Sequence, residues 1–224
     1  MANMTRRIVD DFASFLDEAT EKGLLIDSNQ LVSFPTKKGI RYSWAAGANL
    51  SYLFTDHASI EQYVQVMERR DYSFCMFDGG IIQIDYTIKD DEIKGHRLCY
   101  TPCPFPYQPE DWIGIALSEI PSMMSASELL KEARLGSPIR FDFDAEFTDE
   151  KHAYSHLTLN KQTCRIPAYG PVSLGHFFRF VLRYFYESNF DTGPWLADVR
   201  PKLFTRTLGH PSPHEIHIES AFGY

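Results

Sequence analysis

The stretch Ile81-Ile-Gln-Ile-Asp-Tyr-Thr-Ile88 alternates between two sets of side chains, and this period of two predicts a β-strand with one buried face. The residues expected on the buried face are Ile82, Ile84, Tyr86 and Ile88. Turn signals lie at 78–80 and 89–91, and strand-like sequences flank them at 72–77 and 92–100. This spacing predicts a three-stranded antiparallel meander at the centre of the chain.

Apolar residues at helical spacing predict helices around this meander. Residues 5–22 carry one apolar stripe, and residues 59–70 follow the same pattern behind a serine N-cap. Residues 174–186 are apolar nearly all round, so we expect a central, buried helix there. The predicted fold is therefore α+β, with an antiparallel sheet of meander and hairpin strands packed against several helices, one of them central and strongly apolar.

Composition limits the class of protein further. The chain has 224 residues, of which 44% are hydrophobic and 14% aromatic, which argues against disorder. We expect a single domain over 1–224, with any internal seam at the proline-rich loop 101–110. The net charge of -8 disfavours long-range attraction to nucleic acid or anionic lipid, although a local basic pocket is compatible with it. The absence of a long apolar run predicts no membrane association and a cytoplasmic location.

A second hairpin, from Arg140 to Arg165, carries the densest group of chemically active side chains. Phe141 and Phe143 define one face of its first strand, and acidic residues define the other. A turn centred near residue 150 would place Asp144 opposite His156 and Asp142 opposite Thr158.

An Asp–His pair at that distance fixes the imidazole tautomer and suits general acid–base work. We therefore predict His156, Asp144 and His152 as catalytic residues, with His152 as the second proton-transfer group. Arg140 and Arg165 would bind a phosphate or carboxylate through bidentate hydrogen bonds. Asp142 and Thr158 complete the predicted substrate-binding set.

Three other interpretations of this hairpin stay open. Its polar face fits the solvated side of an ordinary antiparallel sheet, where such pairs are common. Asp142, Asp144, His152 and His156 would also suit a divalent metal, but we expect no metal or other cofactor, because the His-x-x-x-His spacing falls across a turn. His156-Leu-Thr158 matches half of the paired His-x-Thr motif of two-histidine phosphoesterases, and His217-Ile-Glu219 would be an imperfect second half.

The segments Ile139–Asp144, His152–Asn160 and Cys164–Pro167, with the aromatic helix at Phe177–Phe185, together resemble the uncharacterised bacterial family DUF2290. The middle of the chain also resembles small toxin-type proteins. The resemblance implies an α+β fold and supplies no activity. Genes of this kind tend to lie on mobile or defence-related segments, including toxin–antitoxin and phage-defence systems, which implies a nucleic-acid or nucleotide target.

Two functional hypotheses follow. The first is a phosphodiesterase or nuclease-like enzyme, because His156, Asp144, Arg140 and Arg165 would supply a proton acceptor and positive charge at a phosphate. The second is a non-catalytic accessory or immunity protein that binds a protein encoded by a neighbouring gene through its aromatic-rich, acidic surface.

Overall fold

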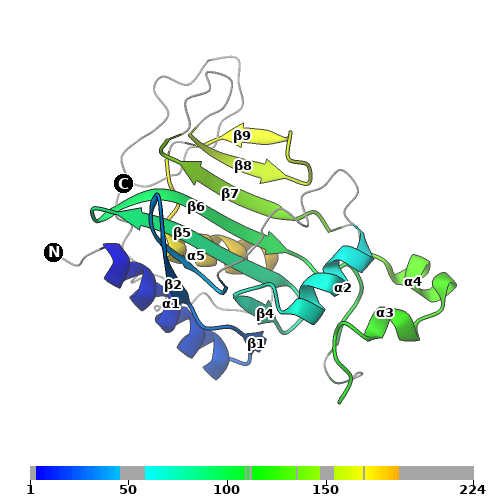
Figure 1. The fold of residues 1–224 in the computed structure, drawn as a ribbon. Helices are drawn as coiled ribbons and strands as arrows, with labels where there is room; N and C mark the ends of the chain where they lie inside the picture. The colour runs from blue at the N-terminus through cyan, green and yellow to red at the C-terminus, as the bar shows by residue number, and fades with distance from the viewer. Residues whose placement is uncertain are drawn as a thin grey trace.

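The computed structural model describes residues 4–45, 59–108, 110, 113–134, 136–146, 154–168 and 170–186. Within these residues the chain forms a nine-stranded sheet and five helices (Figure 1). The helices are α1 (Met4–Glu21), α2 (Ile60–Arg69), α3 (Ile120–Met123), α4 (Ala126–Glu132) and α5 (Leu174–Phe185). The strands are β1 (Leu25–Ser28), β2 (Val32–Thr36), β3 (Gly39–Ser43), β4 (Phe74–Met76), β5 (Ile81–Lys89), β6 (Glu92–Thr101), β7 (Ile139–Asp144), β8 (Ser155–Leu159) and β9 (Arg165–Pro167). The predicted α+β class is confirmed.

The sheet is antiparallel at every pairing described. Its main order is β1-β4-β5-β6-β7-β8-β9, and the β2–β3 hairpin joins it through pairing of β3 with β5. The predicted meander is present as β4, β5 and β6, and the predicted second hairpin is β7 and β8. β9 adds a third strand after that hairpin. The prediction of one domain over 1–224 stays a prediction.

The helix ends follow local sequence signals. Ser59 caps α2 in a capping box with Gln62, and Ser125 caps α4 in a capping box with Glu128. The Ser173 side chain accepts a hydrogen bond from the backbone of α5, as expected for an N-cap. These caps satisfy backbone N–H groups that have no partner inside the helix.

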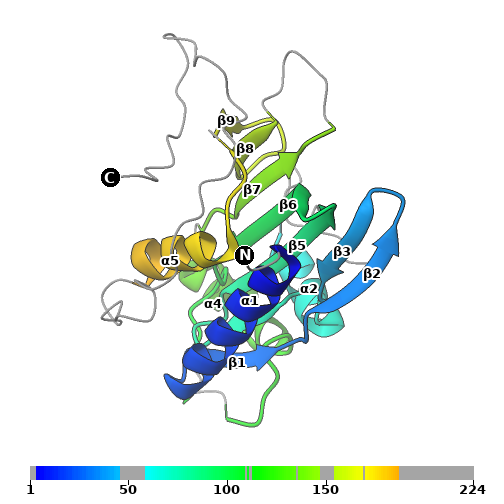
Figure 2. The same ribbon diagram turned by 90° about the vertical axis from the view of Figure 1, so that its left-hand side faces the viewer.

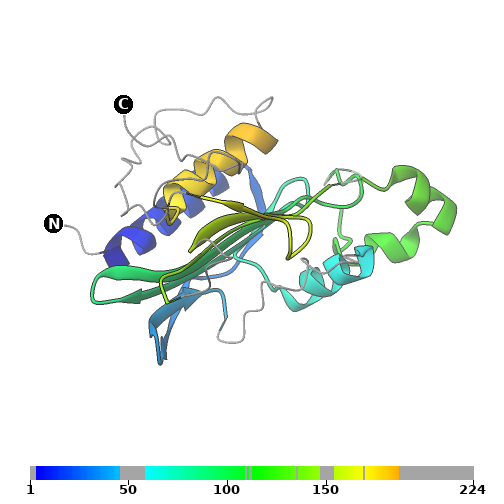
Figure 3. The same ribbon diagram turned by 90° about the horizontal axis from the view of Figure 1, so that it is seen from above.

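One face of the sheet is covered by α1 and α5 (Figures 2 and 3). The alternation of β5 sends Ile82, Ile84 and Tyr86 toward these helices, and all three side chains are fully buried. Phe15 of α1 stacks on Phe178 of α5 with 3.7 Å between ring centroids. α5 is thus part of the main core, as predicted.

The opposite face of the sheet is covered only in part. At one end, α2 and the proline-rich segment after β6 form a second apolar cluster that includes Tyr63, Ile81, Cys99 and Phe105. At the other end, the β2–β3 hairpin folds over the same face, opposite α1 and α5 (Figure 3). Between these two covers, the polar side chains of β5, β6, β7 and β8 remain open to a pocket. This open region holds the candidate site.

Candidate functional site

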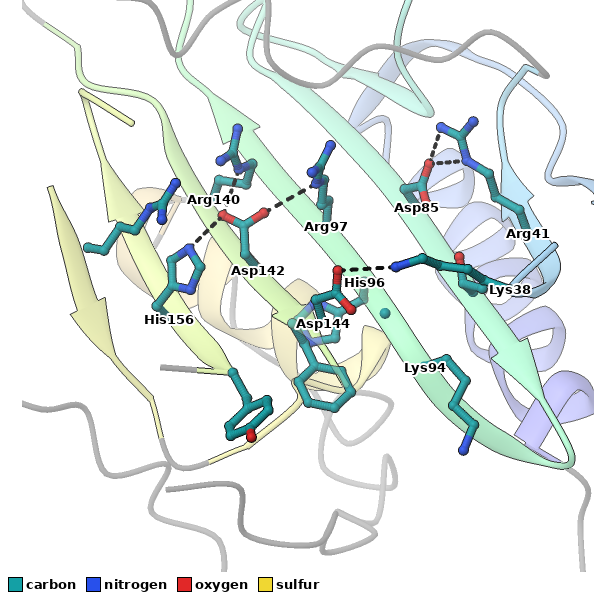
Figure 4. Close-up of a pocket in the computed structure, with 15 residues that line it drawn as sticks. Lys38, Arg41, Asp85, Lys94, His96, Arg97, Arg140, Asp142, Asp144 and His156 are labelled. Atoms are coloured by element: carbon teal, nitrogen blue, oxygen red, sulfur yellow. Dashed lines mark hydrogen bonds and ion pairs between the residues drawn. The ribbon is translucent and has the colours of Figure 1, made fainter. Parts of the chain in front are cut away.

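The open face forms a pocket of about 320 Å³, which we call the open-face pocket (Figure 4). Its basic lining residues are Lys38, Arg41, Lys94, Arg97, Arg140 and Arg165. Its acidic lining residues are Asp85, Asp142 and Asp144. His156 and Tyr154 also line it. Basic residues thus outnumber acidic ones in this pocket, although the chain as a whole carries a net charge of -8.

Asp142 is the centre of the hydrogen-bond network in this pocket. Its Oδ2 accepts hydrogen bonds from Arg140 Nε at 2.8 Å and from Thr158 Oγ1 at 3.0 Å. His156 Nε2 lies 3.4 Å from the same oxygen, and Arg97 Nε lies 3.6 Å from Oδ1. Strand alternation explains the cluster, because Arg140 and Asp142 share one face of β7, and His156 and Thr158 share that face on β8.

Burial and charge act in opposite directions on Asp142. Burial alone would raise the pKa of the carboxyl, but the hydrogen bond from His156 and the charge and hydrogen bond of Arg140 outweigh it and lower the pKa to about 2. Asp142 is therefore a carboxylate at neutral pH. A carboxylate at this position fixes the orientation of the His156 ring.

The predicted pairing of Asp144 with His156 is wrong by two residues. The β7–β8 ladder pairs Asp142 with His156 and Arg140 with Thr158. The turn is centred one residue earlier than expected, and a shift of two residues keeps every side chain on its predicted face. Asp144 instead lies beside Lys38, with 3.5 Å between Lys38 Nζ and Asp144 Oδ2.

Both predicted phosphate-binding arginines lie on the open face, in different environments. Thr158 pairs with Arg140 on one side and with Arg165 on the other, so the two arginines lie two strands apart. Arg140 is 5% exposed and is held by Asp142, whereas Arg165 is exposed and donates from Nε to the Gln162 carbonyl oxygen at 2.8 Å. His152 and the segment with His217 lie outside the described residues.

Sequence reasoning missed the contribution of the meander and of the β2–β3 hairpin. Arg97 pairs with Asp85 on one side and with Asp142 on the other, and its side chain is 57% exposed. Arg41 donates from Nε to Asp85 Oδ2 at 2.6 Å. The alternation that identified the buried face of β5 also assigns Asp85 to the open face, so extending the polar face to β5 and β6 would have found Asp85 and Arg97. Nothing local in the sequence brings Lys38 to β7.

His96 supports the pocket from the helix side of the sheet. The Val172 N–H donates to His96 Nε2 at 2.8 Å, and His96 Nδ1 lies 3.3 Å from the Phe141 carbonyl oxygen. Burial is the main cause that lowers the pKa of His96, to about 4. The neutral ring thus connects the segment before α5 to the sheet beneath Asp142, so His96 stabilises the structure around the pocket.

The open-face pocket suits an anion better than a metal ion. Each acidic lining residue contacts a cation: Asp85 contacts Arg41, Asp142 contacts Arg140, and Asp144 contacts Lys38. Among the described residues no group of three or more His, Cys, Asp or Glu side chains is arranged to hold a metal. Arginine guanidinium groups in a fixed position are the usual partners of phosphate and carboxylate oxygens.

A family model described as an uncharacterized conserved protein, DUF2290, matches residues 25–220. The chain belongs to the DUF2290 family. Searches of curated proteins and of solved structures give no match to this DUF2290 protein. Within the described part of the DUF2290 chain, no helix has the length and apolar character needed to cross a membrane. The family match covers every strand from β1 to β9, including all that form the open-face pocket.

Proposed function

We propose that this protein is a phosphodiesterase or nuclease-like enzyme, and that the open-face pocket is its active site. The observation that carries the proposal is the contact of His156 with Asp142 inside a pocket with an excess of arginine and lysine. Cleavage of a phosphodiester needs a group that moves a proton and positive charge beside the phosphate oxygens. The open-face pocket contains both kinds of group on neighbouring strands.

In this proposal the pocket residues have distinct roles. His156 transfers a proton, and Asp142 holds its ring in one orientation. Arg97 contacts the phosphate, because its side chain is 57% exposed while its Nε remains 3.6 Å from Asp142. Arg140 acts as a positioning residue, because it is buried and fixes the carboxylate of Asp142. Arg165 adds a second exposed cation at the β9 edge.

The test is hydrolysis of a chromogenic diester, bis(4-nitrophenyl) phosphate, and of labelled oligonucleotides by the full chain. We expect turnover by the wild type and a loss of about 100-fold or more in His156→Gln, because a positioned general acid or base contributes at least that much. Arg6→Gln is the matched control, since Arg6 lies on α1 on the covered side of the sheet, with a 79% exposed side chain. Equal activity in His156→Gln and wild type would contradict the assignment.

We further propose that the enzyme acts in a bacterial mobile-element or phage-defence system, as a toxin or effector located in the cytoplasm. The supporting argument is the excess of cations at the site, which suits a nucleic-acid or nucleotide target. Expression of the wild type should slow bacterial growth, and His156→Gln should relieve this effect at equal protein level. Equal growth inhibition by both proteins would oppose this role.

A second candidate function is a non-catalytic accessory or immunity protein that binds a protein encoded by a neighbouring gene. It is favoured by exposed apolar side chains on residues 113–134, which include α3 and α4 and project away from the sheet (Figures 1 and 3). Ile113 is 84% exposed and Leu130 is 82% exposed. Exposed apolar clusters often mark protein interfaces. Capture of the neighbouring gene product by the wild type, and its loss in Leu130→Glu, would support this candidate.

A further inference from the structure

Basic side chains cross most of the width of the open face. Arg41 lies on β3, Arg97 on β6, Arg140 on β7 and Arg165 on β9, and all four line the open-face pocket. The pairing order from β3 to β9 is β3-β5-β6-β7-β8-β9, which makes five strand-to-strand steps. At about 4.8 Å for each step, the basic residues extend over roughly 24 Å.

This span is too long for one phosphate group. Two of the arginines are also fixed in place, because Asp85 holds Arg41 and Asp142 holds Arg140. A ligand that reaches from Arg41 to Arg165 must therefore carry several phosphates in a line. A stacked nucleic-acid strand rises about 3.4 Å per nucleotide, so roughly seven nucleotides fit the span.

The form of the pocket selects a single strand. The pocket has a volume of about 320 Å³, is partly open to solvent and is lined by residues from β3 to β9, so it forms a groove across the strands. The β2–β3 hairpin closes one side, where Lys38 reaches over to Glu146 with 3.1 Å between Nζ and Oε2. A groove of this kind accommodates an extended strand, and a duplex would contact only its rim.

A ribose backbone matches the catalytic groups that the pocket supplies. RNA carries a 2′-hydroxyl next to each phosphate, so the nucleophile is already held near the phosphorus atom. The protein then needs to supply only proton transfer and positive charge, and these are the roles assigned to His156 and to the arginines.

We propose that the substrate is single-stranded RNA, bound across the strands from β9 to β3 and cleaved at the phosphate beside His156; this inference rests on the proposed function. His156 accepts the proton of the 2′-hydroxyl as the 2′-oxygen bonds to phosphorus. The bond from phosphorus to the 5′-oxygen breaks, that oxygen takes a proton from water, and the resulting hydroxide recovers the proton held by His156. The products are a 2′,3′-cyclic phosphate and a 5′-hydroxyl end.

The test compares labelled ribo- and deoxyribo-oligonucleotides of about 2 to about 12 nucleotides, chosen to bracket the length of the groove. We expect cleavage of the ribo-oligonucleotides only, with the cyclic phosphate identified by mass spectrometry. The value of kcat/KM should rise about tenfold or more from the shortest to the longest substrate, as additional phosphates reach additional cations. Deoxyribo-oligonucleotides should bind with similar affinity and remain intact.

Variants at the two ends of the groove separate polymer binding from chemistry. Arg165→Gln and Lys38→Gln should lower kcat/KM for the longest RNA more than for the dinucleotide, with Arg6→Gln as the control. Arg165→Gln and Lys38→Gln should each also reduce the slope of log affinity against log salt concentration by about 0.7, as expected for the loss of one phosphate contact to a single strand.

The outcomes distinguish the two proposals. Turnover of bis(4-nitrophenyl) phosphate that depends on His156, without preference for RNA or for length, would overturn the RNA inference and retain the phosphodiesterase. Equal cleavage of DNA and RNA would also overturn the RNA inference and retain the phosphodiesterase. Binding of RNA that weakens in Arg165→Gln, with no cleavage of any diester, would overturn the enzyme and the cleavage step together. Preferential, length-dependent cleavage of RNA supports both.

Discussion

Asp142 on β7 lies directly opposite His156 on β8, with 3.4 Å between Asp142 Oδ2 and His156 Nε2. The same carboxylate oxygen accepts hydrogen bonds from Arg140 and Thr158. Asp142 therefore joins the proton-transfer candidate to the buried arginine, and it is the residue whose loss should affect both stability and chemistry.

Substituting Asp142→Asn should reduce the free energy of unfolding by about 3 kcal/mol, because it removes the charge that balances the buried Arg140. Asp144→Asn is the matched control. The Asp144 side chain is 47% exposed, so its ion pair with Lys38 contributes less than about 1 kcal/mol. Urea unfolding of both variants measures the difference. Equal destabilisation would contradict the register of β7 and β8.

Substituting Arg97→Gln should lower kcat/KM for a phosphodiester about tenfold while changing the free energy of unfolding by less than about 0.5 kcal/mol, since its side chain is largely exposed. Steady-state kinetics at several salt concentrations provides the measurement. Arg6→Gln changes the same type of residue on the opposite side of the sheet. If both variants lose activity equally, a general charge effect rather than a phosphate contact explains the loss.

The stability of the protein should fall as the pH decreases from about 6.5 to about 4. Histidine in the unfolded chain has a pKa near 6.5, whereas burial lowers the pKa of His96 to about 4 in the folded protein. Between these values only the unfolded state takes up the proton, so the free energy of unfolding decreases, by about 3 kcal/mol in total for His96. His176, whose pKa is also lowered to about 4 by burial, first of all, and by Arg179 and Arg7, should act in the same direction.

Urea unfolding at several pH values tests this dependence. His96→Gln removes the titrating group, so the variant should be less stable at neutral pH but should lose less stability on acidification than the wild type. His176→Gln should also lose less stability on acidification, because the pKa of His176 is lowered too, and Arg6→Gln, at an exposed position on α1, is the control. Parallel pH profiles for wild type and His96→Gln would show that His96 is not the group responsible.

Removal of divalent metals with EDTA should leave phosphodiesterase activity within about twofold of the untreated protein, because cations already neutralise the carboxylates of the pocket. The assay uses the same chromogenic diester with and without the chelator. Loss of activity with EDTA and its recovery with manganese or magnesium would favour the metal alternative. His152, which lies outside the described residues, would then become the first ligand to test.

Local signals made most of the fold predictable. The alternation of 81–88 predicted β5, the serine cap predicted the start of α2, and the apolar run 174–186 predicted α5. The face on which Asp142, Asp144, His156 and Thr158 lie was also predicted correctly, because alternation fixes it. The pairing partner of His156 was not predicted correctly, because a shift of two residues in the strand register leaves the same side chains on the same face.

The rest of the site depends on strand pairings between residues that lie far apart in the sequence. The position of the β2–β3 hairpin depends on pairing of Ile40 with Ile88, which no local pattern encodes. That pairing brings Lys38 to Asp144, a residue 106 positions away in the chain. The roles of His156, Arg140 and Arg165 remain predictions that the experiments above address.

The position of β6 in the sheet has a consequence during synthesis of the chain. β6 pairs with β7 through Gly95–Tyr100, but the residues of β7 follow only after the segment 102–138. At about 5 to 20 residues per second, β6 is an unpaired edge for several seconds on the ribosome. Unpaired apolar strand edges recruit other chains, so a chaperone that binds nascent chains, or slow translation after β7, should raise the soluble yield of this protein.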